Sequence, residues 1–354
     1  MSEIWDVIVI GGGQSGLASG YFLRKKGYQF VILESSNVAA GSWPHYYDSL
    51  QLFSPANFSS LPGMKFPSDL NQYPNKSEVI RYLAEYAQQF QLPVHIKKQV
   101  LSVKKNNHIF TVKTKNGETY HSKVIINATG TFRNPYLPQV KGSELFNGRI
   151  LHSSQYKNPD PFINERIIVV GSGNSAVQIA IELSKVSKTT LAVRQPVRFQ
   201  KQKVLGQDIH VWLKLSGFDQ FPFWRLGKTA PKTKPVLDLG PYKKQVDKGN
   251  PNQVKMFTRF YCDGIIWPDG NKEQVDTVIF ATGYKNHLSH LVKIGAIDST
   301  GEPVHVGGVS TVVPGLYYVG LEGQRSFASA TLRGSGPDAK FVIRKLERYL
   351  KLYK

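Results

Sequence analysis

The sequence is poor in cysteine and in acidic residues, and it contains no long apolar run. Cys262 is the single cysteine, which excludes an intramolecular disulfide and a C-x-x-C redox pair and is typical of a reducing compartment. No apolar segment approaches the length of a membrane-spanning helix, and the first predicted strand follows Met1 too closely to leave room for a secretory signal. We therefore expect a cytoplasmic protein without a membrane span, and no metal site is expected.

Acidic residues are few, since 25 Asp and Glu face 45 Lys and Arg, giving a formal net charge of +20. Basic residues gather between Lys185 and Lys234, where Asp208 and Asp219 are the acidic residues. A solvated basic surface that attracts a phosphorylated coenzyme would explain the excess. Contact with nucleic acid or with an anionic membrane is the alternative, but no nucleic-acid motif is present, so no nucleic-acid partner is expected.

A glycine-rich turn between a β-branched run and an apolar helix stands near the start of the chain. The segment VIVIGGGQSG has the form G-x-G-x-x-G, and Glu34 ends the next predicted strand. Gly11 permits the tight turn, Gly13 lets backbone N–H groups approach a pyrophosphate, and Gly16 lets the helix pack closely on the strand. The pattern predicts a dinucleotide-binding βαβ unit in which Glu34 accepts the hydroxyls of an adenosine ribose.

The same pattern occurs a second time. IIVVGSGNSAVQIAIEL aligns without a gap with VIVIGGGQSGLASGYFL, so Gly171, Gly173 and Ala176 take the places of the three glycines. In this alignment Arg194 takes the place of Glu34. An acid suits a free ribose hydroxyl and repels a 2′-phosphate, whereas an arginine can bind that phosphate with two hydrogen bonds. We therefore expect FAD in the first unit and NADPH in the second, within an α/β fold of two Rossmann-like, three-layer domains.

The 354 residues, of which 41% are hydrophobic, are enough for two domains with their own cores. We expect residues 1–160 to form the first part of an FAD-binding domain. Residues 161–284 are expected to form an NADPH-binding domain with an insertion at 195–260, and residues 285–354 to return to the FAD-binding domain. The insertion could be a substrate lid, a dimer contact or packing material, so a homodimer is one possible assembly.

Several local elements are also predicted. The polar and aromatic segment 36–75 is expected to be an irregular loop that lines the flavin, with a plain surface loop as the alternative. A packing helix capped by Ser77 follows, and then strands with a hairpin turn at 115–117. The final helix is expected to begin near Gly336 and to direct its N-terminus at the flavin. VIINATG and VIFATGY are buried strands that run into small-residue turns, either beside a cofactor or without a ligand.

The order of GGGQSG, F-x-G-x-x-x-H-x-x-x-Y, GSGNSA and FATGY resembles that of the flavin-containing monooxygenases. Phe146, Gly148, His152 and Tyr156 form the second of these patterns. The compact length and the segments GSW, VLG-x-D-I-H and SATLRG are more similar to the small bacterial members, including the cation-efflux-associated flavoprotein group. The resemblance covers nearly the whole chain and implies a glutathione-reductase-like two-domain flavoprotein architecture.

The resemblance also implies which residues hold the two cofactors. The residues that would hold FAD are Gly11, Gly13, Gln14, Ser15, Gly16, Glu34, Ser42, Trp43, Val100, Thr129 and Gly130. The residues that would hold NADPH are Gly171, Gly173, Asn174, Ser175 and Arg194, with Thr282 and Gly283 on the nicotinamide side. No side chain is required as a nucleophile, and the candidate catalytic residues are Asn57, in the loop that would cover the flavin, and His152, which would link the domains or be a structural residue.

Two departures from the family pattern concern oxygen chemistry. Asn57 in FSPANFSS is out of clear register with the asparagine that larger monooxygenases place over the flavin. Leu321 in the turn formed with Val319 and Gly320 replaces the acid of the V-G-D turn found in related reductases. Hydride transfer to the flavin is therefore better supported than stabilisation of an oxygenated flavin.

The expected activity is that of a flavin monooxygenase, in which NADPH reduces FAD and O2 then oxygenates a soft nucleophile such as a sulfide or amine, or a ketone. One alternative is an NADPH oxidase or reductase that passes electrons to O2, a quinone or a metal without inserting oxygen. Another is a nucleotide-sensing flavoprotein that is linked to metal efflux and has no turnover. A disulfide reductase would need a second cysteine. The physiological substrate is not indicated, because the predicted loop and insertion carry no recognisable pattern.

Overall fold

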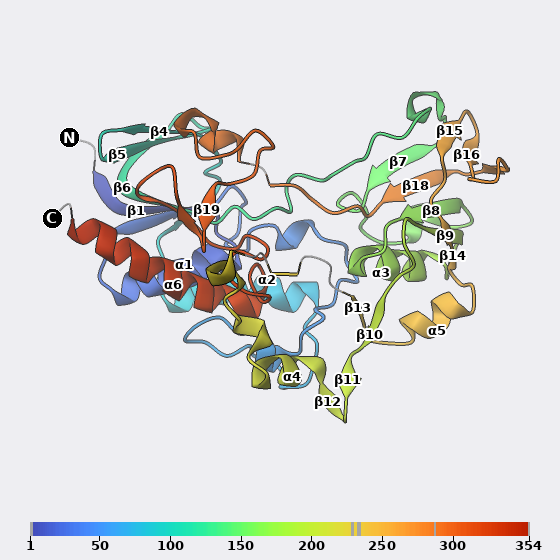
Figure 1. The fold of residues 1–354 in the computed structure, drawn as a ribbon, viewed down its shortest axis with the longest axis horizontal. Coiled ribbons are helices and arrows are strands. Elements are labelled where there is room, and N and C mark those ends of the chain that lie inside the picture. Colours follow the sequence, from blue (N-terminus) through green and yellow to red (C-terminus); the bar gives the residue numbers. More distant parts are fainter. Residues whose placement is uncertain (1–2, 228–229, 232–234, 287, 353–354) are drawn as a thin grey trace.

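The computed structural model describes residues 3–227, 230–231, 235–286 and 288–352. Two α/β units lie side by side, each built on a sheet with a parallel centre (Figure 1). The architecture is the α/β arrangement of two dinucleotide-binding units that the repeated glycine turn predicts. Lys234, at the end of the predicted basic region, lies outside the described residues. Within the described ranges, no helix combines the length and the apolarity that a membrane span requires.

The first sheet has the strand order β19-β20-β21-β6-β1-β2-β3, and its central pairs are parallel. Val7, Val9 and Ile32 are fully buried, as expected for strands covered on both faces. β5 pairs antiparallel with β4 and, through the predicted turn at 115–117, with β6. The strands of this sheet are β1 Ile4–Ile10, β2 Phe30–Leu33, β3 Val94–His95, β4 Val100–Asn106, β5 Ile109–Thr114, β6 Thr119–Asn127, β19 His305–Val306, β20 Val309–Ser310 and β21 Leu316–Tyr318.

The second sheet has the order β14-β9-β8-β18-β7, and every pair in it is parallel. Helix α3, Asn174–Leu183, follows β8 and packs on the sheet in the same way that α1, Gln14–Lys25, follows β1. A small antiparallel sheet of β15, β16 and β17 joins this unit. The strands are β7 Arg149–His152, β8 Arg166–Val170, β9 Lys188–Val193, β14 Asn252–Lys255, β15 Arg259–Tyr261, β16 Gly264–Ile266, β17 Lys272–Gln274 and β18 Thr277–Phe280.

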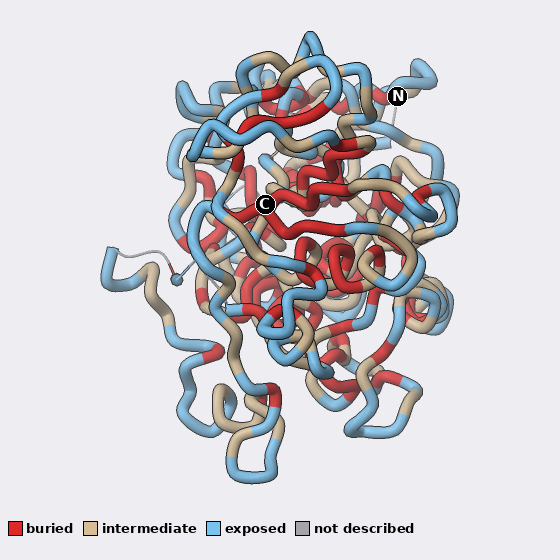
Figure 2. The backbone as a smooth tube through the Cα atoms, turned by 90° about the vertical axis from the view of Figure 1, so that its right-hand side faces the viewer, coloured by how far each residue is buried: buried red, intermediate tan, exposed pale blue. Residues whose placement is uncertain are grey.

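The C-terminal part of the chain lies on the first unit. β21 pairs with β6, and helix α6, Leu332–Lys351, packs against α1 (Figure 1). The helix begins at Leu332 rather than near Gly336 as predicted, because the Thr331 side chain accepts a hydrogen bond from the Gly334 N–H and caps it. Pro337 is the sixth residue of the helix and lacks the N–H that would otherwise bond the carbonyl oxygen of Arg333 one turn earlier. Buried backbone runs through the centre of the molecule in Figure 2, with exposed loops outside.

Strand β7 belongs to the second sheet, where it pairs with β18 through Ile150 and Val278 and their neighbours. This sheet membership differs from the predicted division at 160/161, because β7 precedes that point. Strand β14, within the predicted insertion at 195–260, is likewise an edge strand of the same sheet, beside β9. Sheet pairing depends on long-range backbone hydrogen bonds, which a local break such as the Pro-rich segment 157–165 does not reveal.

The middle of the insertion crosses to the first unit, whereas β13 and α5 pack against α3 of the second. Asp219 accepts hydrogen bonds from Arg333 at 2.8 and 3.0 Å, and the ring of Trp224 lies 5.3 Å from that of Phe341. The segment therefore packs on α6, as Figure 1 shows, and joins the two units. The elements of the whole insertion, besides β14 and β15, are β10 Phe199–Lys201, β11 Lys203–Val204, β12 Gln207–Asp208, α4 Ile209–Leu215, η5 Phe218–Gln220, η6 Phe223–Leu226, β13 Val236–Asp238 and α5 Tyr242–Asp247.

Helix α2, Lys76–Gln89, is present as predicted, but its cap is Asn75 rather than Ser77. The Asn75 side chain accepts a hydrogen bond from the Glu78 N–H at 3.0 Å, and the Glu78 carboxylate accepts one from the Asn75 N–H at 2.8 Å. This reciprocal pair is a capping box, which satisfies two backbone donors at once. The Asn-x-x-Glu pattern that forms this box begins at Asn75, two residues before Ser77.

We expect Asn75→Ala to lower the free energy of unfolding by about 1 kcal/mol, because it leaves the first turn of α2 without its side-chain acceptor. Ser77→Ala is the matched control and should change stability by only a few tenths of that amount. Urea unfolding followed by circular dichroism measures both. Equal losses for the two variants would show that Asn75 is not the cap in solution.

Candidate cofactor and active site

A cavity of about 550 Å³ lies where the two units meet. The glycine turns of both units, the 36–75 loop and the start of α6 all contribute to its wall. It therefore combines segments that lie far apart in the sequence. The predicted site residues that line it are Gly11, Gly13, Gln14, Ser15, Glu34, Ser42, Trp43, Val100, Thr129, Gly130, Gly173, Asn174, Ser175 and Gly283.

The first glycine turn leaves no room for side chains. Gly11 has φ +107°, and a Cβ there would lie 2.5 Å from the carbonyl oxygen of Ala128. A Cβ on Gly16 would lie 1.8 Å from the carbonyl oxygen of Gly11. Helix α1 begins after Gly13 without a side-chain cap and without an acid in its first turn. Its N-terminal N–H groups thus remain available to an anion, and the helix dipole favours negative charge there.

The Glu34 carboxylate is buried at the end of β2, with 2% of the residue exposed. It accepts hydrogen bonds from the Gly12 N–H at 2.6 Å and from the Ser36 N–H at 2.7 Å. Each carboxylate oxygen can accept more than one hydrogen bond, so ribose hydroxyls can still be bound. These two bonds fix the carboxylate beside the glycine turn, which fits the predicted adenosine site.

The second glycine turn repeats this geometry. Gly171 has φ +144°, and a Cβ there would lie 2.5 Å from the carbonyl oxygen of Ala281. Helix α3 also begins without a side-chain cap or an acid in its first turn. The Asn174 Oδ1 atom is buried and has no hydrogen-bond partner among the described residues. A buried polar atom without a partner is costly, so this site fits a ligand that donates a hydrogen bond.

Arg194 lies at the end of β9, one residue beyond the strand, and its side chain is exposed. It does not line the cavity. The strand position matches that of Glu34 after β2, but the burial differs, because Glu34 is enclosed by its own turn. Arg194 is therefore an exposed cation, whereas Glu34 is a buried anion.

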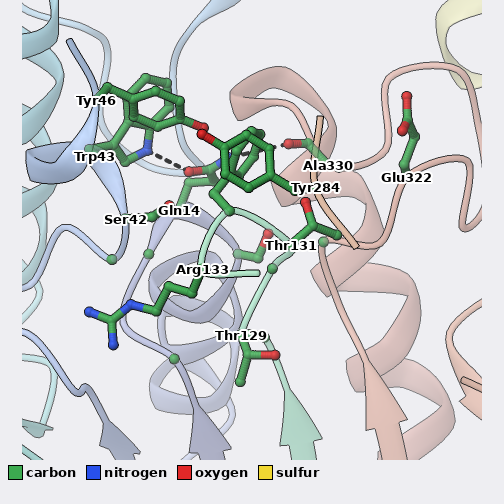
Figure 3. Close-up of a pocket in the computed structure, with 18 of the residues that line it drawn as sticks. Gln14, Ser42, Trp43, Tyr46, Thr129, Thr131, Arg133, Tyr284, Glu322 and Ala330 are labelled. Carbon is green, nitrogen blue, oxygen red and sulfur yellow. Dashed lines mark hydrogen bonds between the residues drawn. The ribbon is translucent and has the colours of Figure 1, made fainter. Parts of the chain in front are cut away.

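Gln14 joins three separate segments of the wall. Its Oε1 accepts a hydrogen bond from the Trp43 Nε1–H at 2.7 Å, and its Nε2 donates to the carbonyl oxygen of Ala330 at 3.2 Å (Figure 3). Ala330 has φ +69°, a left-handed conformation that is costly for a residue with a Cβ. The side chain of Gln14 thus helps to fix a strained backbone at the cavity.

Aromatic rings form a continuous wall between the two units. The ring centroids of Trp43 and Tyr46 lie 5.4 Å apart, those of Tyr46 and Phe132 5.2 Å, and those of Phe132 and Tyr284 5.0 Å. Figure 3 shows the hydroxyl ends of Tyr46 and Tyr284 pointing toward each other. Burial raises the pKa of both hydroxyls, so they stay neutral near pH 7 and can donate hydrogen bonds.

His152 is fully buried at the end of β7 and lies outside the cavity lining. Its Nδ1 accepts a hydrogen bond from the Ser154 N–H at 3.1 Å, so its Nε2–H donates to the carbonyl oxygen of Gly283 at 3.0 Å. Its ring also lies 4.9 Å from that of Tyr284. Both nitrogens are thus occupied by the backbone, and His152 fixes the turn that carries Gly283 and Tyr284.

Four other predicted residues also lie outside the lining. Gly16 packs against the carbonyl oxygen of Gly11 and Gly171 packs against that of Ala281. Thr282 donates a hydrogen bond to the carbonyl oxygen of Tyr136 at 2.5 Å. Asn57 is exposed on the short helix η2, Ala56–Phe58, and does not reach the cavity. The lining part of this loop ends at Ser54, and η2 packs on the core through Ala56, which leaves Asn57 at the surface.

Sequence reasoning missed several residues that line the cavity. They are Gly41, Tyr46, Tyr47, Phe132, Arg133, Tyr284, His290, Glu322 and Ala330. Tyr284 directly follows Gly283, so the FATGY motif itself could have indicated it. In related reductases the acid of this turn stands at the position of Leu321. Here the acid is Glu322, one residue later. The others carry no local signal, because their segments meet only in the folded chain.

His152 should make stability depend on pH. Burial lowers the pKa of its imidazole, so the folded protein resists protonation while the unfolded chain does not. The stabilisation present at neutral pH is therefore lost as pH falls below about 6.5. Thermal unfolding between pH 7.5 and pH 5.5 should show a smaller fall in Tm for His152→Gln than for the wild type. His108→Gln, at an exposed position, should keep the wild-type slope; an unchanged slope in His152→Gln would contradict the assignment.

Comparison with known proteins agrees with this geometry. Residues 8–216 match the family model described as pyridine nucleotide-disulphide oxidoreductase. An uncharacterized CzcO-like oxidoreductase of Geobacillus kaustophilus is 37% identical over 97% of this chain and 98% of its own. A probable indole-3-pyruvate monooxygenase of Arabidopsis thaliana is 32% identical over 79% of this chain and 76% of its own.

The structure of a flavin-containing monooxygenase from Stenotrophomonas maltophilia superposes with a TM-score of 0.87 and 34% identity, covering 99% of this chain and 100% of that one. The described fold, the paired glycine turns and these relatives agree. The chain belongs to the pyridine nucleotide-disulphide oxidoreductase family, among its flavin monooxygenase-like members of the CzcO type.

Proposed function

We propose that this protein is an NADPH-dependent FAD oxidoreductase that acts as a flavin monooxygenase on a sulfide, an amine or a ketone. The observation that carries the proposal is the meeting of two glycine turns at one cavity, with a buried acid after the second strand of one unit and an exposed arginine at the matching place in the other. One turn suits a nucleotide with a free ribose, and the other suits a nucleotide with a 2′-phosphate.

FAD would be held by the first unit. The backbone at Gly11 and Gly13 and the uncapped start of α1 would bind its pyrophosphate, and Glu34 would accept its ribose hydroxyls. Gln14, Ser15, Ser42, Trp43, Val100, Thr129 and Gly130 line the same cavity. When bound, FAD supplies the hydride acceptor and the centre that reacts with O2.

NADPH would be held by the second unit. The uncapped start of α3 would bind its pyrophosphate near Gly173 and Ser175, and the unpartnered Asn174 Oδ1 would accept a hydrogen bond from a hydroxyl or amide donor of the coenzyme. Arg194 would bind the 2′-phosphate outside the cavity. Gly283 would lie toward the nicotinamide, with Thr282 and His152 holding that turn in place.

The protein's own residues would exclude water and orient the two rings. The aromatic wall from Trp43 to Tyr284 would separate the cavity from solvent, and its neutral tyrosine hydroxyls would offer hydrogen bonds without charge. Gln14 would keep Ala330 and Trp43 at fixed positions along the wall. The helix α6, beginning at Leu332, would direct the positive end of its dipole toward the same cavity.

We assign residues up to 148 and from 285 onward to the FAD-binding domain, and residues 149–284 to the NADPH-binding domain. The first boundary moves ahead of 160 because β7 pairs in the second sheet. Within 195–260, the part from Phe199 to about Leu226 reaches the FAD-binding domain, as its contacts with Phe53 and Arg333 support.

An oxidase or reductase that does not insert oxygen is the second candidate, and the outward position of Asn57 favours it. A dithiol mechanism is disfavoured, because Cys262 is exposed between β15 and β16 and does not line the cavity. Regulation without turnover would require that the purified protein not oxidise NADPH by itself.

NADPH consumption, hydrogen peroxide and oxygenated product should be measured in one reaction against a panel of sulfides, amines and ketones. For a monooxygenase, a good substrate should raise product until it nearly equals the NADPH consumed, while peroxide falls. If the peroxide formed equalled the NADPH consumed with every substrate, oxygen insertion would be contradicted and the oxidase would be supported. If the FAD-loaded protein did not oxidise NADPH, both the monooxygenase and the oxidase would be contradicted.

Arg194→Ala should lower kcat/KM for NADPH about 10- to 100-fold, because it removes a charge-assisted bond to the 2′-phosphate. The value for NADH should change by less than about threefold, since NADH has no such phosphate. Lys188→Ala, at the opposite end of β9, is the matched control and should affect neither coenzyme. Equal losses with NADPH and NADH would show that Arg194 does not select the phosphate.

A further inference from the structure

The hairpin of β11 and β12 carries a leucine at its tip. Leu205 and Gly206 form the two-residue turn between the strands, with φ +48° and +75°. Leu205 is 85% exposed, the largest exposed fraction among the large apolar side chains of the described residues. The hairpin lies at the lower margin of the molecule in Figure 1, away from the two sheets.

This turn is an unfavourable place for leucine. A two-residue hairpin turn with positive φ at both positions favours Asn-Gly, because asparagine tolerates the left-handed region and leucine does not. The side chain also gains no burial here to offset the backbone strain. A largely exposed leucine held in a strained conformation at a projecting tip points to a role outside the fold itself.

More apolar side chains are exposed along the segment that follows. They belong to α4, to the short helices η5, Phe218–Gln220, and η6, Phe223–Leu226, and to their connections. The exposed fractions are 72% for Leu215, 38% for Phe218, 44% for Phe221 and 60% for Leu226. We call the exposed side chains of the segment from Lys201 to Leu226, with Leu205 at its hairpin tip, the insertion surface.

The exposed charged side chains of this segment are positive. Lys201, Lys203, Lys214 and Arg225 are exposed between residues 201 and 226. The two acids of the same segment turn inward. Asp208 accepts hydrogen bonds from the Tyr73 hydroxyl at 2.5 Å and from the His210 Nδ1–H at 2.7 Å, and Asp219 pairs with Arg333 at 2.8 Å.

These inward contacts also fix the segment to the molecule. Burial raises the pKa of Asp208, but hydrogen bonds from His210, Tyr73 and Gln202 outweigh it and lower the pKa to about 2, so the carboxylate stays charged. Gln202 also donates to the carbonyl oxygen of Phe53 at 3.1 Å. The insertion surface is therefore presented by a segment tied at several points, with its negative charge used internally.

We propose that the insertion surface docks on an anionic lipid bilayer, with Leu205 and its apolar neighbours entering the interface and the basic side chains facing the lipid phosphates. A bilayer with anionic headgroups matches both features, because it offers an apolar interior beneath a negative surface. A symmetric contact between two copies would bring this basic face against itself in a chain of net charge +20, which is repulsive. The proposal is independent of the reaction that the cavity performs.

Flotation of the purified full-length protein with lipid vesicles tests the proposal. One set of vesicles contains phosphatidylcholine alone, and the other contains phosphatidylcholine with phosphatidylglycerol, each at low and at high salt. Binding to the mixed vesicles is expected, with weak binding to phosphatidylcholine and a clear decrease at high salt. Absence of binding to the mixed vesicles would overturn the proposal.

Leu205→Asn is the informative variant, because asparagine suits the turn and removes the apolar side chain. Its Tm should equal or exceed that of the wild type, while its partition onto mixed vesicles should fall about tenfold or more. Leu145→Ser is the matched control, since Leu145 is 61% exposed on η3, Ser143–Leu145, outside the surface. An equal loss in this control would overturn the assignment of the insertion surface.

The charge requirement has its own pair of variants. Lys203→Glu should weaken binding to the mixed vesicles and leave the weak binding to phosphatidylcholine unchanged, whereas Lys113→Glu, exposed on β5, should have little effect. Light scattering of the lipid-free protein tests whether a second copy of the chain, rather than a bilayer, covers the insertion surface. The proposal would be overturned in favour of self-association if the wild type formed a dimer that Leu205→Asn dissociates and did not bind vesicles.

Discussion

Backbone contact at the carboxyl ends of parallel strands is the constraint on which both halves of this molecule depend. In each unit the first glycine of the turn passes against the carbonyl that follows a neighbouring strand, Ala128 in one and Ala281 in the other, at a distance that no Cβ could occupy. This contact directs the following helix so that its N-terminus opens on the same edge as the strand ends. Ligands of open α/β sheets bind at that edge, which explains why the cavity lies there in both units.

The cavity wall is made by contacts across the chain rather than by either turn alone. Gln14 joins the first turn to Trp43 and to the strained Ala330, and the aromatic rings continue from Trp43 to Tyr284 in the other unit. His152 holds the turn before Tyr284 through its hydrogen bond to the carbonyl oxygen of Gly283. The residues that surround the site are therefore positioned by a chain of side-chain contacts that begins in one glycine turn and ends behind the other.

The insertion shows how one segment can serve two surroundings. Its acids face inward, where they bind Tyr73, His210 and Arg333 and support the loop and helix that line the cavity. Its lysines and leucines face outward. Because the two carboxylates pair with groups inside the protein, the exposed charges of the segment are positive although its sequence contains both signs. Folding thus gives this part of the surface a positive potential.

The sequence by itself determined the two nucleotide units, because a glycine turn between a strand and a helix is a local pattern whose backbone needs are met by a few adjacent residues. It also determined the central strands of both sheets, the helix α2 and the contrast between Glu34 and Arg194. Caps were less certain, since Asn75 and Thr331 compete with nearby residues that have the same chemistry.

Tertiary structure alone decided where β7 pairs, that Asn57 faces outward, and that Tyr46 meets Tyr284. Each of these depends on partners that are distant in the sequence, and their approach depends on packing of whole elements rather than on any local preference. For the same reason, the inward turn of Asp208 and Asp219 is absent from the charge pattern and present only in the folded chain.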